Sequence, residues 1–168
     1  MTASVDSLLA RMADAERRLV EHADAPIPSG LTEPDSGGEE RWEAGQVWAH
    51  LAEFPDYWLA QAQLVIDQAS DAPVPFGRTK ADADRMAAIE RDRHTDPEAL
   101  LARVRDSLVR VTDAARRWPA EAWRRVGLHP TLGEMTVERL VERFIVAHLE
   151  EHADQLDGLE RLEDGGRP

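Results

Sequence analysis

Apolar residues recur at steps of three and four along four long segments of this sequence, and this spacing is the feature that most constrains the fold. Such spacing places the apolar side chains on one face of an α-helix. The segments run over about residues 5–23, 43–67, 95–117 and 136–162. We find no convincing alternation of apolar and polar residues, the pattern typical of a half-buried strand. The sequence therefore predicts an all-α four-helix bundle, in which each apolar face is buried against the others.

The segments between the predicted helices are rich in residues that interrupt helices. Residues 25–40 contain three prolines and a Ser-Gly-Gly run, and residues 68–94 contain two prolines and a glycine. A short helical piece is expected over residues 82–90, and residues 127–133 are expected to form a loop. Connections of this length permit a crossover along the bundle rather than a tight hairpin. The prediction is therefore a bundle with long crossover connections.

Two helix starts can be assigned from their residues. Thr95 and Glu98 have the spacing of a capping box, and Pro97 lies in the first turn, where its missing N–H group is not needed. Thr136 is a good N-cap for the last helix. We therefore expect the third and fourth helices to begin at these two threonines.

The length of 168 residues fits a single domain, 1–168, with an ordered core over about residues 4–162. No apolar run approaches the roughly 20 residues that a membrane crossing needs, and the first residues do not resemble a signal peptide. A cytoplasmic protein without a membrane partner is expected. The net charge of −13 would repel nucleic acid over most of the surface, so no nucleic-acid partner is expected.

The sequence contains no cysteine. Disulfides, thiolate metal ligands and a sulfur nucleophile belonging to the chain are therefore excluded. Any thiol chemistry requires a thiol that comes from outside the protein.

Two histidines stand four residues apart in the last predicted helix, His148 and His152. This spacing places them one turn apart, with about 5–6 Å between their Cβ atoms, which suits chelation of a metal ion. The spacing alone is weak evidence, because such pairs also occur on solvated helices. Their position is stronger evidence, because both lie on the apolar face of the helix. That face runs through Val141, Phe144 or Ile145, His148, His152 and Leu156.

A third histidine, His50, lies on the apolar face of the second helix, between Val47 and Phe54. Buried imidazoles without partners cost a few kcal/mol each, roughly, whereas coordination to a cation satisfies one nitrogen of each ring. Three inward histidines from two helices predict a three-ligand site with an open position, which is typical of a catalytic metal rather than a structural one.

Two blocks of the sequence resemble a known superfamily. The first is Trp42–Leu51, with a tryptophan followed by Ala-His-Leu on the second helix. The second is His129–Thr136, which leads into His148–His152 and then Gln155–Leu156. Both are similar to the DinB-like metal-binding bundles, the superfamily that includes mycothiol-dependent maleylpyruvate isomerase and the bacillithiol S-transferases. With the order of the helices, the resemblance covers most of the chain.

The resemblance implies a metal site at His50, His148 and His152, because such families hold Zn²⁺, Ni²⁺ or a related ion through one histidine of the second helix and an H-x-x-x-H pair of the fourth. It does not specify the substrate. An open site of three nitrogens can activate water or an incoming thiol. Because the chain has no cysteine, a thiol route would need a low-molecular-weight thiol such as mycothiol.

Several other polar residues are interpreted as structural or solvated. Glu53 and Glu151 are each three residues after a predicted ligand, and we expect both to be solvated helix charges. The sequence does not form the zincin motif H-E-x-x-H, because Leu149 stands where that motif has its glutamate, so a metalloprotease is disfavoured. No ligand role is assigned to His22, His94 or His129, and no binding role to Arg78.

Three functions are compatible with this reading. The first is an enzyme that activates a thiol or water at the metal, a transferase or isomerase acting on a small electrophile. The second is a non-catalytic binding or dimerisation module that the metal stabilises. The third is a metal-dependent hydrolase. The expected partners are a small-molecule substrate or thiol, and a homodimer is an arrangement that the sequence allows.

Overall fold

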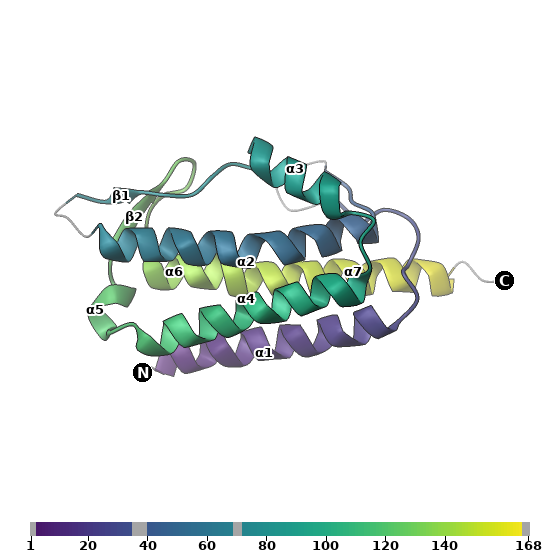
Figure 1. Ribbon diagram of the computed structural model, residues 1–168, viewed down its shortest axis with the longest axis horizontal. Coiled ribbons are helices and arrows are strands. Elements are labelled where there is room, and N and C mark those ends of the chain that lie inside the picture. The colour runs from purple at the N-terminus through teal and green to yellow at the C-terminus, as the bar shows by residue number, and fades with distance from the viewer. Residues whose placement is uncertain (1–2, 35–39, 69–71, 166–168) are drawn as a thin grey trace.

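The computed structural model describes residues 3–34, 40–68 and 72–165, and its main body is a bundle of four long helices (Figure 1). The four helices are α1 (Ala3–Asp24), α2 (Ala44–Asp67), α4 (Pro97–Arg117) and α7 (Ala147–Gly165). The last of these is preceded by the short helix α6 (Val137–Val141) and by one π-helical turn, η1 (Glu142–Val146). All four helices predicted from the apolar spacing are present, so the predicted four-helix bundle is confirmed.

The helices form a square in which α1 and α2 are diagonal to each other, because each of them packs against both α4 and α7. Figure 1 shows α1 and α7 running in one direction and α2 and α4 in the opposite one. The connection from α2 to α4 must therefore return along the length of the bundle. The predicted crossover is confirmed, and it carries α3 (Ala83–Asp92), which packs against α2.

A small three-stranded sheet lies at one end of the bundle. Its strands are β1 (Val74–Pro75), β2 (Val126–His129) and β3 (Gly133–Thr136), and the four-residue helix α5 (Ala120–Trp123) precedes β2. Strand β1 pairs in parallel with β2, and β2 pairs antiparallel with β3. The prediction of a loop over residues 127–133 was therefore wrong, since that segment is most of a β-hairpin.

The hairpin escaped prediction because its alternation is the reverse of the usual one. In β2 the apolar side chains of Val126 and Leu128 are exposed, whereas Gly127 and His129 are buried. A strand normally buries its apolar residues. The hydrophobic pattern therefore gave no indication of a strand here.

The helix starts are capped by side chains, although one cap differs from the prediction. Asp96, not Thr95, caps α4: its side chain accepts a hydrogen bond from the Glu98 backbone N–H group at 3.0 Å. Asp96 is the residue immediately before Pro97, so the cap lies one residue later than predicted. Thr136 caps α6 as predicted, accepting from the Arg139 N–H group at 3.2 Å.

The apolar faces of the helices meet in one connected core. Its largest fully buried side chains are Trp48, Phe54, Leu19, Leu51, Leu100, Leu140, Ile145, Leu149, Leu156, Leu159, Val5 and Val47. No described helix combines the length and the apolar character that a membrane crossing requires.

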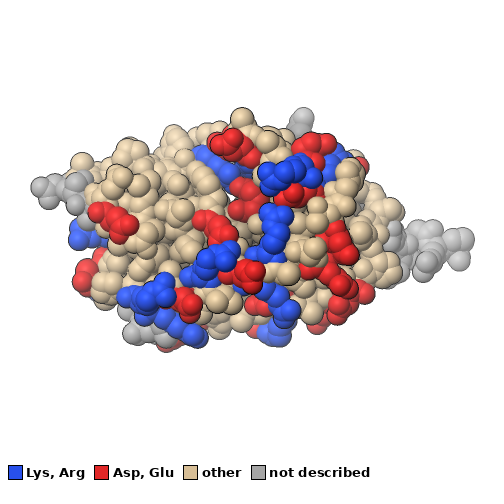
Figure 2. Space-filling model, viewed as in Figure 1, with Lys and Arg blue, Asp and Glu red and all other residues tan. Residues whose placement is uncertain are grey.

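The outer surface is covered by charges of both signs, which Figure 2 shows interspersed over one face. Many of them join neighbouring helices. Arg11 of α1 reaches Glu150 of α7 at 2.6 Å, and Arg110 of α4 reaches Asp56 of α2 at 2.7 Å. Exposed pairs of this kind contribute little individually, on the order of 0–1 kcal/mol each. These ion pairs are consistent with the packing of the helices, but the apolar core is the main source of the stability of the bundle.

Candidate metal centre

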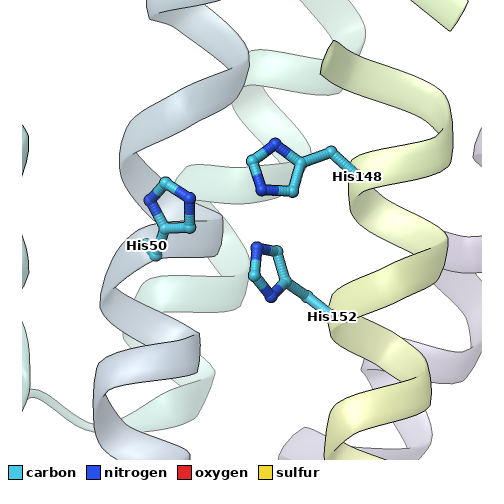
Figure 3. Close-up of side chains that lie close together, drawn as sticks. All are labelled: His50, His148 and His152. Atoms are coloured by element: carbon cyan, nitrogen blue, oxygen red, sulfur yellow. The ribbon is translucent and has the colours of Figure 1, made fainter. Parts of the chain in front are cut away.

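The three predicted ligands converge inside the bundle. His50 comes from α2, His148 and His152 come from successive turns of α7, and Figure 3 shows their rings turned toward one another. One ring nitrogen of each lies within 4.8 Å of those of the other two. Within the described residues this is the one group of three histidines or carboxylates spaced to hold a metal ion. The geometry is that of the proposed site, and metal binding itself stays a prediction.

The orientation of His50 is set by a carboxylate on its own helix. Nδ1 of His50 lies 3.1 Å from Oε2 of Glu53, so Nδ1–H donates to the carboxylate and the lone pair is on Nε2. The other oxygen of Glu53 accepts a hydrogen bond from Arg78. Burial raises the pKa of Glu53, and the Arg78 guanidinium opposes that rise. The Glu53 side chain is thus only 11% exposed and bonded through both oxygens, and its interpretation as a solvated charge was wrong.

His152 is oriented in a similar way by an amide. Its Nδ1 atom lies 2.8 Å from Oε1 of Gln155, one turn further along α7. A carbonyl oxygen only accepts, so Nδ1 carries the proton and Nε2 carries the lone pair. That Nε2 atom is buried and receives no hydrogen bond from a described residue. A buried lone pair of this kind is what a metal ion would satisfy.

His50 and His148 are held in their neutral form, which is the form that binds metals. Burial lowers the pKa of His50 well below its ordinary value, and the charges of its neighbours lower it further. Burial also lowers the pKa of His148 well below its ordinary value, while a hydrogen bond to the Phe144 backbone acts in the opposite direction. His148 is the ligand that is partly exposed, on the side of the cavity described below. These two rings can therefore bind a cation without first losing a proton near neutral pH.

The indole of Trp42 closes one side of the triad. Its ring stacks on His152 with 5.8 Å between centroids and meets the edge of His50 at 5.1 Å. Its backbone is tied to Thr32, whose side chain accepts from the Trp42 N–H group at 3.0 Å. Thr32 is buried, so the connection between α1 and α2 is only partly exposed; residues 35–39 of it lie outside the described part.

The π-helical turn η1 changes which side chains face the triad. A π-turn inserts one extra residue into a helix and shifts the faces that precede it. Ile145 is fully buried in the core, whereas Phe144 is half-buried and stacks on Trp58 with 4.0 Å between centroids. The alternative that the spacing left open is thereby resolved: Ile145 faces the core and Phe144 faces the site. The turn contains no proline or glycine, so it could not be predicted from its residue types.

A cavity of about 350 Å³ opens over the triad. Its lining comes from the segment before α2, α2, the segment before α3, α3, the hairpin, η1 and α7. The lining residues are Trp42, His50, Trp58, Arg78, Thr79, Lys80, Arg85, His129, Thr131, Leu132, Arg143, Phe144, His148, Glu151 and His152. The volume suits a small molecule.

His129 and Arg78 belong to this cavity, although no role for either was expected from the sequence. The side chain of Arg78 is only 9% exposed, and its guanidinium lies 3.8 Å from the ring of Tyr57. Nδ1 of His129 accepts from the backbone N–H group of Thr131 at 3.3 Å, so its proton is on Nε2. Burial lowers the pKa of His129. The hairpin that places His129 was not predicted, which is why its position over the site was missed.

The remaining candidates lie apart from the triad. His94 is exposed. His22 is buried between α1 and α7, where its Nε2 atom lies 2.8 Å from Asp157. Glu151 is exposed at the edge of the cavity. No ligand role was expected for His22 and His94, and the structure places neither of them within the group that converges.

Solved structures with the same fold include one protein described as a probable metal-dependent hydrolase. YfiT from Bacillus subtilis, described as a probable metal-dependent hydrolase with an unusual four-helix bundle topology, has a TM-score of 0.71 at 20% identity. The match covers 98% of this chain and 90% of YfiT. A Clostridium difficile 630 protein of uncharacterised function has a TM-score of 0.68 at 7% identity, covering 96% of this chain and 98% of that one.

The mycothiol-dependent maleylpyruvate isomerase also shares the fold. Its TM-score is 0.67 at 15% identity, and the match covers 95% of this chain but only 65% of the isomerase. At these identities the likeness establishes the fold alone. No functionally curated protein matches the sequence. The sequence itself matches the DinB superfamily over residues 4–156, and the chain belongs to that superfamily.

Proposed function

We propose that this protein is a metal-dependent transferase or isomerase that acts on a small electrophile and uses a low-molecular-weight thiol of the mycothiol type. The observation that carries the proposal is the convergence of His50, His148 and His152 at the floor of a cavity, with ring nitrogens within 4.8 Å of one another. Three nitrogen ligands leave a coordination position open, as in catalytic sites. Zn²⁺ or Ni²⁺ is the expected ion.

The donor set fits such an ion. The hydrogen bonds of His50 and His152 leave each ring with its lone pair on Nε2, and the lowered pKa of His50 keeps that ring neutral. A divalent ion held there would lower the pKa of a bound thiol or water and so supply a nucleophile at neutral pH. The chain lacks cysteine, so the thiol would have to be a separate molecule.

The surrounding residues would orient the reactants and limit the access of water. Trp42 covers the triad on one side, and the stacked rings of Trp58 and Phe144 form an apolar wall of the cavity. These rings would bind the body of an electrophile.

The proposal can be tested with mycothiol and 1-chloro-2,4-dinitrobenzene. In that reaction the sulfur bonds to the ring carbon, chloride leaves with its bonding electrons, and the thiol proton passes to solvent. Zinc- or nickel-loaded protein should accelerate loss of the thiol above the spontaneous rate, and His148→Ala should abolish the acceleration. His94→Ala, a change of an exposed histidine, should leave it intact. Equal rates with and without loaded protein, across several thiols and electrophiles, would count against the proposal.

A metal-dependent hydrolase is the second candidate, favoured by the likeness to YfiT over nearly the whole length of both chains. It uses the same centre with water in place of the thiol. Hydrolysis of p-nitrophenyl esters by the metal-loaded protein without any thiol, lost in His148→Ala, would favour this candidate over the first.

A non-catalytic module is the alternative to both enzymes. In that case the metal would tie α2 to α7, and an oligomeric face or groove would carry the function. Removal of the metal by a chelator would then unfold the protein, and the metal-loaded protein would bind no added thiol at its metal. Light scattering of the purified protein would test for a homodimer, which the sequence allows.

A further inference from the structure

The cavity over the triad has a charge opposite to that of the protein. Four of its lining residues are basic, Arg78, Lys80, Arg85 and Arg143, and one is acidic, Glu151. The chain as a whole has a net charge of −13. A local excess of positive charge in an acidic protein attracts anions to that place, because the walls of a cavity focus the field of the charges that line it.

Arg143 is the lining cation with the least compensation. Within the described part of the chain it forms no ion pair, and its guanidinium lies 5.9 Å from the ring centroid of Phe144, on the cavity wall. Its charge contributes to the lowered pKa of His129, after the larger effect of burial. Arg143 therefore acts electrostatically on the interior of the cavity although its side chain is exposed.

The π-turn explains why Arg143 lines the same cavity as the triad. In a continuous α-helix each residue turns by about 100°, so residue 143 would lie about 140° around the helix from residue 148. A π-turn winds less per residue and reduces that difference. Because η1 contains Arg143 and ends two residues before His148, both side chains line one cavity.

Arg78 supplies a second, rigid cation. Its side chain is 9% exposed, bonded to Glu53, 3.7 Å from a carboxylate oxygen of Asp82 and stacked on Tyr57. Its charge reaches the triad, where it is among the causes that lower the pKa of His50 and His148. Between the cations lies the apolar surface of Trp58 and Phe144, whose rings stack with 9° between their planes.

We propose that the cavity, which Arg78 also lines, binds a small organic carboxylate, with its charge held at Arg143 and its apolar body against Trp58 and Phe144. Arginine pairs with a carboxylate through two parallel hydrogen bonds, and planar aromatic walls suit an unsaturated or aromatic body. This inference names the substrate class of the proposed enzyme and rests on that function for its catalytic meaning. The binding site itself depends only on residues of the chain.

The experiment measures binding of benzoate and of its neutral counterpart benzamide, followed by the tryptophan fluorescence of the protein or by calorimetry. It is run on zinc-loaded and on chelator-treated protein, so that a carboxylate bound by the metal alone is recognised. Benzoate should bind about tenfold or more tightly than benzamide in both forms, and added salt should weaken it. Equal binding of benzoate and benzamide would overturn the proposal.

The decisive variant is Arg143→Gln, with Arg139→Gln as the matched control. Arg139 lies one turn earlier, is outside the cavity and pairs with Glu142. Arg143→Gln should weaken benzoate by about tenfold or more, whereas Arg139→Gln, with the same loss of charge, should change it less than about twofold. Equal effects of the two variants would overturn the proposal, and inorganic phosphate binding as tightly as benzoate would overturn the assignment to a carboxylate.

The outcomes separate this inference from the proposed function. If benzoate binding depends on Arg143 but the protein takes up no metal, the proposed metal enzyme is refuted and the carboxylate site is not. If metal uptake depends on His148 but benzoate binding is the same with and without Arg143, the carboxylate site is refuted and the proposed metal enzyme is not.

Discussion

Glu53 and His50 are joined on the inner face of α2, where Oε2 of the carboxylate lies 3.1 Å from Nδ1 of the imidazole. The hydrogen bond fixes the tautomer of His50 and leaves its Nε2 lone pair for a ligand. Arg78 bonds to the second oxygen of Glu53, so a residue of the cavity wall is connected to a residue of the triad. Metal affinity and the shape of the cavity should therefore both depend on Glu53.

Substitution Glu53→Ala should lower metal affinity by about 10–100-fold, because the His50 ring loses its orientation and its basicity. Glu53→Gln should have a smaller effect, because an amide oxygen can still accept from Nδ1. The affinities are measured by competition with a coloured chelator.

Glu33 offers a matched control for this substitution. It is exposed, and its nearest cation is 4.0 Å away. Glu33→Ala should leave metal affinity unchanged. A Glu53→Ala protein that binds metal as tightly as the unmodified protein would show that the carboxylate does not support the site.

The metal-free protein should lose stability as the pH falls below about 6.5. The pKa of His50 is lower in the folded protein than in the unfolded chain, mainly because the ring is buried. As the pH falls, the unfolded chain therefore takes up the proton first. Full stability is present above the unfolded pKa, and it decreases by about 1.4 kcal/mol per pH unit per such histidine until the folded pKa is reached.

Urea unfolding of chelator-treated protein between pH 7.5 and 6 measures this dependence. The lowered pKa values of Asp56, Asp92 and Asp157 act below about pH 4 and do not enter this window. In His50→Gln the free energy of unfolding should change less with pH, by the contribution of one histidine. In His94→Gln its dependence on pH should be unchanged. The same slope in both variants would contradict the buried, neutral His50.

Two helical glycines should respond in opposite directions to alanine. A Cβ atom on Gly45 of α2 would lie 2.1 Å from the backbone oxygen of Arg93, so the segment before α4 would have to move. Gly158 of α7 has no atom within 4 Å of the same position. Gly45→Ala should destabilise the protein by about 1–3 kcal/mol, and Gly158→Ala should stabilise it by about 0.5–1 kcal/mol.

The comparison is made by urea or thermal unfolding of the two variants under the same conditions. Because alanine has the higher helix propensity at both positions, the difference between the variants isolates the close approach of α2 to Arg93. A stabilising Gly45→Ala would mean that this approach is not tight in solution.

The bundle could be predicted from the sequence because the features that determine its helices are local and periodic. The apolar faces, the proline at the start of α4 and the cap at Thr136 are each set by residues a few positions apart. The same holds for His148 and His152, whose relation is fixed by one turn of helix. The convergence of His50 with them follows from its position on an apolar face that has to be buried.

The rest of the site could not be predicted, because it depends on contacts between distant segments. His129 faces the cavity only through the pairing of β2 with β1 and β3, and the buried pattern of β2 does not follow its hydrophobicity. The Glu53 side chain is only 11% exposed, and one of its partners, Arg78, lies 25 residues later in the sequence. The π-turn that places Arg143 at the cavity contains no proline or glycine from which it could be predicted.

The central claim is that His50, His148 and His152 together hold one divalent ion, and titration with Co²⁺ tests it most directly. Visible absorption bands of the bound ion report both its stoichiometry and its geometry. We expect saturation at one equivalent per chain with the spectrum of a nitrogen-ligated site with an open position, loss of those bands in each histidine-to-alanine variant of the triad, and retention in His94→Ala. Bands that persist at full intensity when the triad histidines are replaced, or no binding by the unmodified protein, would contradict the account.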